Sequence, residues 1–351
     1  METSERIAQR LRQFGELEAA TSPLYRRLAP LAAARPELVA LLRERRSGQP
    51  PANVLLAALQ RRLMDRPEAP LAAYFPTLGG TRAPDDELAT ALDAFWPGEL
   101  DALAGLVRTR RVATNEVRRA AVLRLAYVAV ARRLIERGRP PTAHLVEIGA
   151  SAGLLLAWDR FAYRYGSAGF GDPDAPLTLT TAWRGTVPPD AHAPFTVAER
   201  LGVDVEPIDL DDPEAAAWLR ALIWPEHVER AAAFDAARAV ARRLALTVRA
   251  ADALTFLPDG LDALAGRLPA VVVHAFTVNQ FSDAMRARFD QALGEAARTR
   301  PIFRVGLEWA PGGARLALTT YPGGRTTELA RADPHVAWVE PLENEPATPT
   351  R

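Results

Sequence analysis

The chain of 351 residues contains no cysteine and no lysine. Without cysteine it can form no disulfide, no thiolate nucleophile and no cysteine-ligated metal centre. All 43 basic residues are therefore arginine, and 43 acidic residues balance them to a formal net charge of zero. A neutral chain has no overall positive field that attracts polyanions. We therefore expect neither nucleic acid nor an acidic membrane surface as a partner.

Long apolar runs are also missing from the sequence. A helix that crosses a bilayer needs about 20 consecutive apolar residues, and no stretch approaches that length. The N-terminus, residues 1–6, is charged and has no apolar signal core. No group of His, Asp and Glu has the spacing of metal ligands. These absences predict a cytoplasmic protein with no resident metal.

The first 140 residues have the pattern of helices. Apolar residues recur every three to four positions, beginning with Ile7, Leu11, Phe14 and Leu17. The pattern continues to a long helix that ends where residues 138–141 read Gly-Arg-Pro-Pro. Residues 1–140 are therefore predicted to form an N-terminal helical domain or cap.

Residues 141–342 alternate between strand and helix patterns. Predicted strands of the main sheet follow a first strand that ends near residue 147, and they are 197–204, 246–252, 270–276 and 302–309. An antiparallel pair, 315–321 and 336–339, is predicted to close the sheet, and residues 166–194 to form an inserted hairpin. The pattern predicts a Rossmann-like α/β domain with a mostly parallel sheet. The polar tail 343–351 is predicted to be disordered.

The loop at residues 147–153 is the strongest functional signal. A strand ends in Glu147, and Gly149-Ala150-Ser151-Ala152-Gly153 leads into an apolar helix. The two glycines allow a tight turn and a close approach of backbone to ligand. Free N–H groups at a helix N-terminus favour a negatively charged ligand. The loop therefore predicts a site for a nucleotide-like cofactor.

This loop has two functional interpretations and one purely structural one. Glu147-x-Gly149-x-Ser151-x-Gly153 resembles the first motif of the class I S-adenosylmethionine-dependent methyltransferases. The same residues also read as G-x-S-x-G, the nucleophile elbow of α/β-hydrolases. A tight turn built from small residues for packing alone would look the same.

The order of strands favours methyl transfer over hydrolysis. A nucleophile elbow follows several strands of its sheet, whereas here the strands follow the loop. In class I methyltransferases an acid after the second strand binds the ribose hydroxyls, and an acid after the third lies near the adenine. Asp204 and Asp252 resemble these two acids. The resemblance predicts S-adenosylmethionine as cofactor, held by Glu147, Gly149, Ala150, Ser151, Gly153, Asp204 and Asp252.

The other parts of the reaction are less defined by the sequence. His274 ends a buried strand that faces the predicted site, and its ordinary pKa suits a general base. The methyl acceptor is an unidentified small molecule or protein. Arg118 and Arg119 could reach an anionic substrate, and several aromatic residues could line the acceptor site: Tyr163, Tyr165, Trp183, Trp224 and Trp309.

Two alternatives stay open. The first is a serine hydrolase of α/β-hydrolase type with Ser151 as nucleophile. The second is a non-catalytic adenosyl-ligand-binding or scaffold protein that has kept the fold. The order of the strands does not address the second alternative.

The chain also resembles a bacterial family catalogued as domain of unknown function 2332. The resemblance rests on these segments: Thr114-Asn115-Glu116-x-x-Arg119, residues 149–154, Asp159-Arg160-x-x-Tyr163-x-Tyr165-Gly166, Arg200-x-Gly202-x-Asp204-x-x-Pro207 and Trp218-Leu219-x-x-x-Ile223-Trp224-Pro225. Leu155 stands where the family pattern has asparagine. The family carries no assigned reaction, so the resemblance implies a fold and not an activity.

Overall fold

The computed structural model describes residues 2–114, 116–186 and 194–342. The chain divides into two compact units. The first contains residues 1–115 and 210–235, and the second contains residues 116–209 and 236–351. The predicted tail, 343–351, lies outside the described residues.

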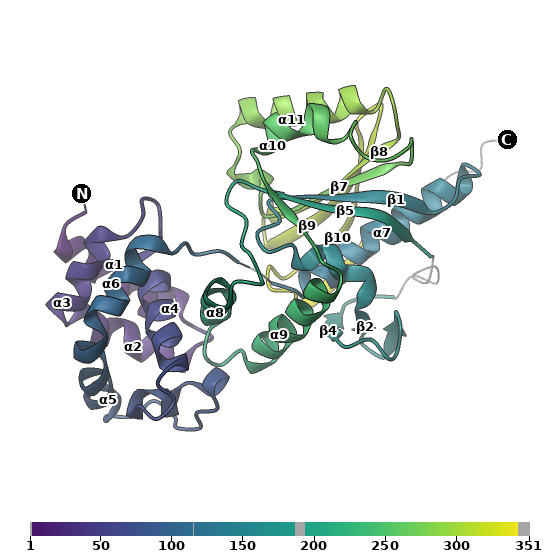
Figure 1. Cartoon of the computed structure of the whole chain (residues 1–351). Helices are drawn as coiled ribbons and strands as arrows, with labels where there is room; N and C mark the ends of the chain where they lie inside the picture. The colour runs from purple at the N-terminus through teal and green to yellow at the C-terminus, as the bar shows by residue number, and fades with distance from the viewer. Residues whose placement is uncertain (1, 115, 187–193, 343–351) are drawn as a thin grey trace. The chain divides into compact units, whose positions relative to one another are not determined.

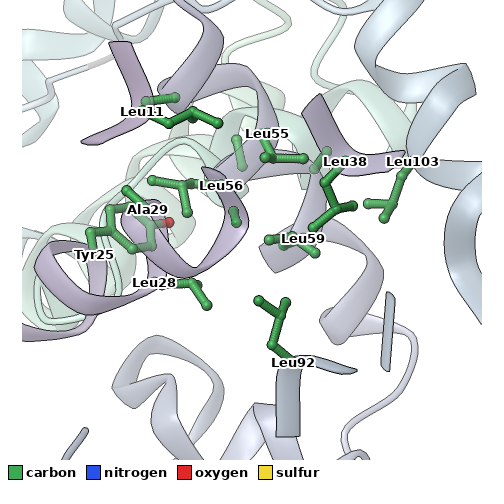
Figure 2. Packing of buried hydrophobic residues seen from close by; sticks show 14 of the residues in the cluster. Leu11, Tyr25, Leu28, Ala29, Leu38, Leu55, Leu56, Leu59, Leu92 and Leu103 are labelled. Carbon is green, nitrogen blue, oxygen red and sulfur yellow. The ribbon is translucent and has the colours of Figure 1, made fainter. Parts of the chain in front are cut away.

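The described elements of the first unit are helices. Its α-helices are α1 (Ser4–Gln13), α2 (Pro23–Ala33), α3 (Pro36–Leu41), α4 (Pro51–Met64), α5 (Leu88–Phe95), α6 (Leu100–Thr109) and α8 (Pro213–Ala221). Shorter segments join them: η1 (Phe14–Glu18), η2 (Leu42–Glu44), η3 (Pro70–Tyr74), η4 (Pro76–Leu78) and η5 (Trp96–Glu99). Buried leucines from several helices form the core, among them Leu28, Leu56, Leu59 and Leu92 (Figure 2).

The segment 210–235 joins the first unit through specific contacts. Trp218 is buried in the helical core, and its indole N–H donates to the carbonyl of Arg111 at 2.6 Å. The buried Gln60 side chain donates to the carbonyl of Ile223 at 3.0 Å. The predicted boundary near residue 140 is therefore wrong in two ways. The N-terminal segment of the first unit ends at residue 115. The unit also includes 26 residues from the middle of the chain, residues 210–235.

The second unit is a mixed α/β structure around one large sheet (Figure 1). Its helical segments are α7 (Arg119–Glu136), η6 (Leu154–Arg160), α10 (Ala253–Gly260), η7 (Val278–Gln280) and α11 (Asp283–Ala296), and α9 (Val228–Arg243) contains the second boundary between the units. The strands are β1 (Thr142–Ile148), β2 (Ala162–Tyr165), β3 (Ala168–Phe170), β4 (Thr178–Trp183), β5 (Thr196–Asp204), β6 (Val248–Ala250), β7 (Ala270–Ala275), β8 (Ile302–Ala310), β9 (Gly313–Tyr321), β10 (Arg325–Ala332) and β11 (Trp338–Pro341).

The described strands lie in the order β3-β2-β4-β11-β10-β9-β8-β7-β1-β5-β6. All pairs from β6 to β8 are parallel. The strands β8, β9, β10 and β11 are antiparallel neighbours. The mostly parallel sheet agrees with the prediction. The predicted closing pair is wrong, because the unpredicted β10 lies between β9 and β11.

Helices cover both faces of this sheet. Alternate residues of β1, Val146 and Ile148, pack in a core that includes Phe256 of α10 and Phe289 of α11. The opposite face packs against α7, which lies across β8, β9 and β10. The helix α7 therefore belongs to the sheet and not to the predicted helical domain.

The predicted insertion contains a hairpin that begins earlier than expected. The strands β2 and β3 pair as an antiparallel hairpin within residues 162–170, and β4 then pairs parallel to β2 and to β11. Residues 187–193 of the predicted insertion lie outside the described ranges. Within those ranges, no helix combines the length and apolar character needed to cross a bilayer.

Candidate functional site

The order of the parallel strands creates a switch point beside β1. After β1 the chain adds β5 and β6 on one side, and then returns to add β7 and β8 on the other. Glu147 is paired in register with Gly202 of β5 and with Val273 of β7. The carboxyl ends of β1, β5 and β7 therefore meet at one edge. Open α/β sheets bind ligands at this place.

The loop after β1 adopts the left-handed backbone conformations that its two glycines suggest. Gly149 and Gly153 have φ values of 73° and 71°, and Ser151 has a φ of 52°. A Cβ on Gly149 would lie 2.2 Å from Oγ1 of Thr277, in the loop after β7. The first glycine is thus required by a neighbouring side chain as well as by the turn. The backbone of Ser151 is in a left-handed conformation that residues other than glycine rarely adopt.

Most of the backbone donors in this loop are already used within the protein. The N–H groups of Gly149 and Ala150 donate to the carbonyl of Val203, at 2.8 and 3.2 Å. The N–H of Ser151 donates to Asp204 at 2.8 Å. The apolar helix predicted after the loop is η6, a short 3-10 helix. The expectation of a loop with free N–H donors is therefore wrong at these three positions.

Glu147 is a buried carboxyl on the α7 side of the sheet. Its side chain lies opposite the core made by Val146 and Ile148, and the residue is 3% exposed. Its Oε2 atom has no hydrogen-bond partner among the described residues. Burial raises the pKa of Glu147 to about 8, and the charge of Asp204 raises it as well, while Arg119 lowers it. The site therefore holds an acid that is largely protonated at neutral pH.

Asp204 links the end of β5 to the glycine loop. One carboxylate oxygen accepts from the N–H of Ser151, and the other accepts from the N–H of Glu206 at 2.9 Å. Each carboxylate oxygen can accept a second hydrogen bond. Asp204 thus supports the loop and retains acceptor capacity for a ligand hydroxyl.

Asp252 follows β6 and caps a helix. Its Oδ1 accepts from the N–H groups of Leu254 and Thr255, at 2.9 and 3.2 Å, at the start of α10. The side chain is exposed. This geometry is that of an ordinary N-cap. Among the predicted cofactor residues, Asp252 therefore has the least structural support for a role in ligand binding.

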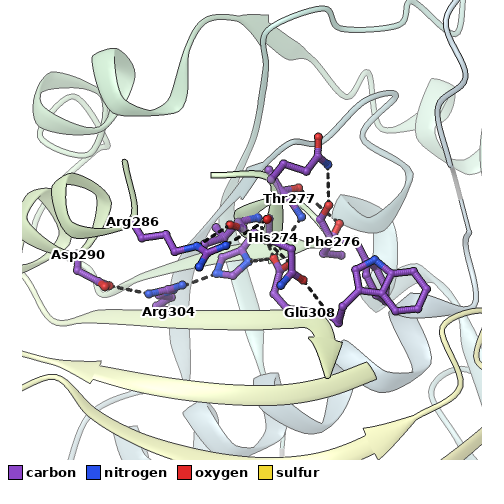
Figure 3. A network of polar contacts seen from close by, with 12 residues as sticks. His274, Phe276, Thr277, Arg286, Asp290, Arg304 and Glu308 are labelled. Carbon is purple, nitrogen blue, oxygen red and sulfur yellow. Dashed lines mark hydrogen bonds and ion pairs between the residues drawn. The ribbon is translucent and has the colours of Figure 1, made fainter. Parts of the chain in front are cut away.

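His274 lies in a buried polar network at the end of β7 (Figure 3). Arg304 donates to its Nε2 at 2.9 Å, so Nδ1 carries the proton and donates to Glu308 at 2.5 Å. The residue is 1% exposed, and burial lowers its pKa below the ordinary value. Because both ring nitrogens are engaged, the geometry does not support the predicted general base. It favours a positioning role for His274.

Glu308 ties this network to the loop after β7. Burial would raise its pKa, but hydrogen bonds from His274 and from backbone N–H groups hold it below the ordinary value. The N–H groups of Thr277, Val278 and Asn279 donate to its carboxylate at 3.2, 3.0 and 3.1 Å. Sequence reasoning missed Glu308. The sequence contained one signal for it. Arg304 lies four residues before Glu308 on a buried strand, so the two charged side chains share one face of that strand.

An aromatic pair stands beside this loop at the same edge. Phe276 has a φ of 57°, and its ring lies edge-on to Trp309, with centroids 4.8 Å apart. Trp309 is 57% exposed. The guanidinium carbon of Arg119 lies 4.2 Å from the centroid of Phe276. The amide oxygen of Asn279 accepts from the Trp309 backbone N–H at 2.6 Å.

The structure thus gathers most of the predicted residues at one edge of the sheet. Glu147, the loop from Gly149 to Gly153, and Asp204 surround the switch point. Among the aromatic candidates, Trp309 is at this edge, whereas Trp224 belongs to the helical unit. No group of three or more side chains suited to hold a metal occurs among the described residues.

Comparison with known proteins gives one match. A family described as "Uncharacterized protein conserved in bacteria (DUF2332)" matches residues 8–340. No curated protein and no solved structure matches the chain.

Proposed function

The chain belongs to the DUF2332 family, and we propose that its second unit binds S-adenosylmethionine and transfers the methyl group to an acceptor. The observation that carries the proposal is the switch point beside β1, where Glu147, the glycine loop and Asp204 come together. The order β6-β5-β1-β7-β8 is the 3-2-1-4-5 order of doubly wound nucleotide-binding sheets.

The proposed cofactor fits the chemistry of these residues. The free acceptor capacity of Asp204 suits a ribose diol, since a carboxylate accepts two hydrogen bonds and donates none. The unpartnered oxygen of Glu147 suits the ammonium group at the methionine end. Arg119, in the first turn of α7, lowers the pKa of Glu147 and so favours the charged carboxylate with which the ammonium group would pair.

When bound, S-adenosylmethionine supplies the electrophilic methyl group. The protein residues would then act mainly by positioning the ligand and excluding water. The network of His274 and Glu308 holds the loop after β7 against Gly149, so the two loops at the switch point are fixed relative to each other.

Binding by Asp204 can be tested with a matched pair of variants. Asp333, after β10, also accepts from two backbone N–H groups, those of His335 and Ala337. We expect S-adenosylhomocysteine at about a hundred times its Kd to stabilise the wild-type protein and Asp333→Asn by about 2.7 kcal/mol. Asp204→Asn should lose most of this stabilisation. Equal stabilisation of both variants would remove Asp204 from the site.

The left-handed conformation of Ser151 is one observation in favour of a hydrolase, since a nucleophile elbow is strained in this way. The geometry of His274 opposes it, because Nε2 accepts from Arg304 and cannot also accept a proton from a serine. A fluorophosphonate probe that labels the folded protein, with loss of labelling in Ser151→Ala, would establish hydrolysis instead of methyl transfer.

A further inference from the structure

The two sides of the switch point differ in chemistry. On one side, β5 ends in Asp204, and β6 is followed by Asp252. On the other side, Phe276 follows β7 and forms an aromatic pair with Trp309, near the end of β8. A ligand that crosses the switch point would meet carboxylates at one end and aromatic rings at the other.

Several contacts and one backbone conformation constrain the aromatic pair. The backbone of Phe276 is in the left-handed region, which is rare for a bulky residue. Asn279 accepts from the backbone N–H of Trp309, and Glu308 in turn accepts from the N–H of Asn279. His274 and Arg304 continue the same network into the sheet, and Figure 3 shows Phe276 beside it. Strain and polar constraints of this kind collect at functional sites.

The pair nevertheless presents one ring to solvent. Trp309 is more than half exposed, although Phe276 covers part of it in an edge-on contact. The indole therefore keeps a surface on which another ring can stack. The guanidinium of the buried Arg119 packs on the Phe276 ring and brings positive charge to that side of the pair.

We propose that Phe276 and Trp309, hereafter the aromatic platform, bind the methyl acceptor, and that this acceptor is a planar aromatic ring bearing an acidic oxygen, such as a phenol or an aromatic carboxylic acid. The ring stacks on Trp309, and the oxygen lies toward Arg119. That the bound ring is a methyl acceptor rests on the proposed function. The class of ligand rests on the geometry of the platform alone.

The test compares rings with saturated compounds of similar size and charge. Phenol, benzoate and 4-hydroxybenzoate are titrated into the full-length protein beside cyclohexanol, cyclohexanecarboxylate and 4-hydroxycyclohexanecarboxylate, with and without S-adenosylhomocysteine. Saturation-transfer NMR gives the affinities. We expect at least one ring to bind about tenfold more tightly than its saturated partner, since stacking on an aromatic side chain contributes about this much.

Variants locate the binding. Trp309→Leu keeps apolar area and should abolish the preference for the ring, whereas Trp309→Phe should keep part of it. Leu268, exposed before β7 at the opposite edge of the sheet, supplies the control Leu268→Ala, which should change nothing. Failure of every ring to bind, or a preference that survives Trp309→Leu, would overturn the proposal.

Three further outcomes separate this inference from the proposed function. If adenosine displaces the ring compound, the platform takes the adenine and the inference is wrong. If a ring binds at Trp309 but no adenosyl compound binds anywhere, the aromatic platform stands and methyl transfer fails. If S-adenosylhomocysteine binds and no ring does, only the platform fails.

Discussion

At the scale of single residues, Glu147 decides how the site responds to pH. The sequence identified this acid from its place before the glycine loop. Its protonation depends on the contacts of α7 and β5, which are distant in sequence, so it could not be read from the motif. The same holds for His274, whose apparent suitability as a base disappears once Arg304 and Glu308 occupy its two nitrogens.

Glu147→Gln should become progressively more stable than the wild type as pH rises. The folded-state pKa of about 8 lies above the ordinary value of 4.5. Between these two pH values the folded protein binds a proton that the unfolded chain has released, so the wild type loses stability as pH rises. The difference in free energy of unfolding should grow to about 5 kcal/mol by pH 9 and vanish near pH 4. Denaturant titrations across this range measure it. The control Glu328→Gln, on an exposed pair with Arg315, should show no such trend, and a constant difference for Glu147→Gln would contradict the account.

Glu147 should also release a proton when the cofactor binds. The ligand ammonium favours the charged carboxylate, so binding should tighten as pH rises toward 8. Calorimetric titrations of S-adenosylhomocysteine at pH 7 in phosphate and in Tris reveal proton release as a difference in apparent enthalpy. Glu147→Gln should show the same enthalpy in both buffers. Equal enthalpies for the wild type would mean that Glu147 stays protonated or lies away from the ligand.

At the scale of elements, the loops after β1 and β7 form one interlocked structure. Thr277 lies against Gly149, and Glu308 holds the N–H groups of the β7 loop. The sequence showed the two glycines and the buried strand β7. It could not show that β7 is the neighbour of β1, because strand order is set by packing between segments more than 100 residues apart. It also missed β10, whose polar residues do not give the continuous apolar pattern of the central strands.

Gly149→Ala should destabilise the protein more than Gly166→Ala. Both glycines have positive φ, 73° and 59°, so both variants carry the backbone strain of about 1–2 kcal/mol. Only at Gly149 does the new Cβ meet Thr277, at 2.2 Å, while at Gly166 the nearest atom is 4.0 Å away. We expect an additional loss of about 1–3 kcal/mol for Gly149→Ala, measured by chemical unfolding. Equal losses would show that Thr277 moves aside at no cost.

Glu308→Gln should loosen the loop after β7. The amide can accept fewer of the hydrogen bonds that now come from His274 and from Thr277, Val278 and Asn279. We expect faster hydrogen exchange at these three amides and a loss of about 2–4 kcal/mol. Glu328→Gln, on an exposed pair, should cost less than about 1 kcal/mol. Unchanged exchange at residues 277–279 would mean that Glu308 does not hold the loop.

At the scale of the whole molecule, the chain builds two cores from interleaved segments. The helical periodicity of the first 110 residues predicted helices correctly, and the strand patterns after residue 141 predicted a mostly parallel sheet. The interleaving was not predictable from periodicity, because an amphipathic helix such as α8 does not reveal which core it joins. The Trp218 and Trp224 motif shared with the family is explained here by packing, since both side chains contact the helical core.

The segment 210–235 should therefore be required for the first unit. A fragment of residues 1–115 leaves the surface that covers Trp218 exposed, and it leaves the Gln60 side chain without the carbonyl of Ile223. In the full chain, Trp218→Ala should cost about 3–5 kcal/mol, whereas Leu17→Ala, at a 76% exposed position, should cost less than about 0.5 kcal/mol. Chemical unfolding measures both. A fragment 1–115 that unfolds as cooperatively as the full chain would contradict the shared core.

We propose above all that the switch point beside β1 binds an adenosyl cofactor. The most direct measurement is calorimetric titration of the purified full-length protein with S-adenosylmethionine and S-adenosylhomocysteine. We expect saturable binding of both at one site per chain. Binding of neither by a protein shown to be folded would contradict it.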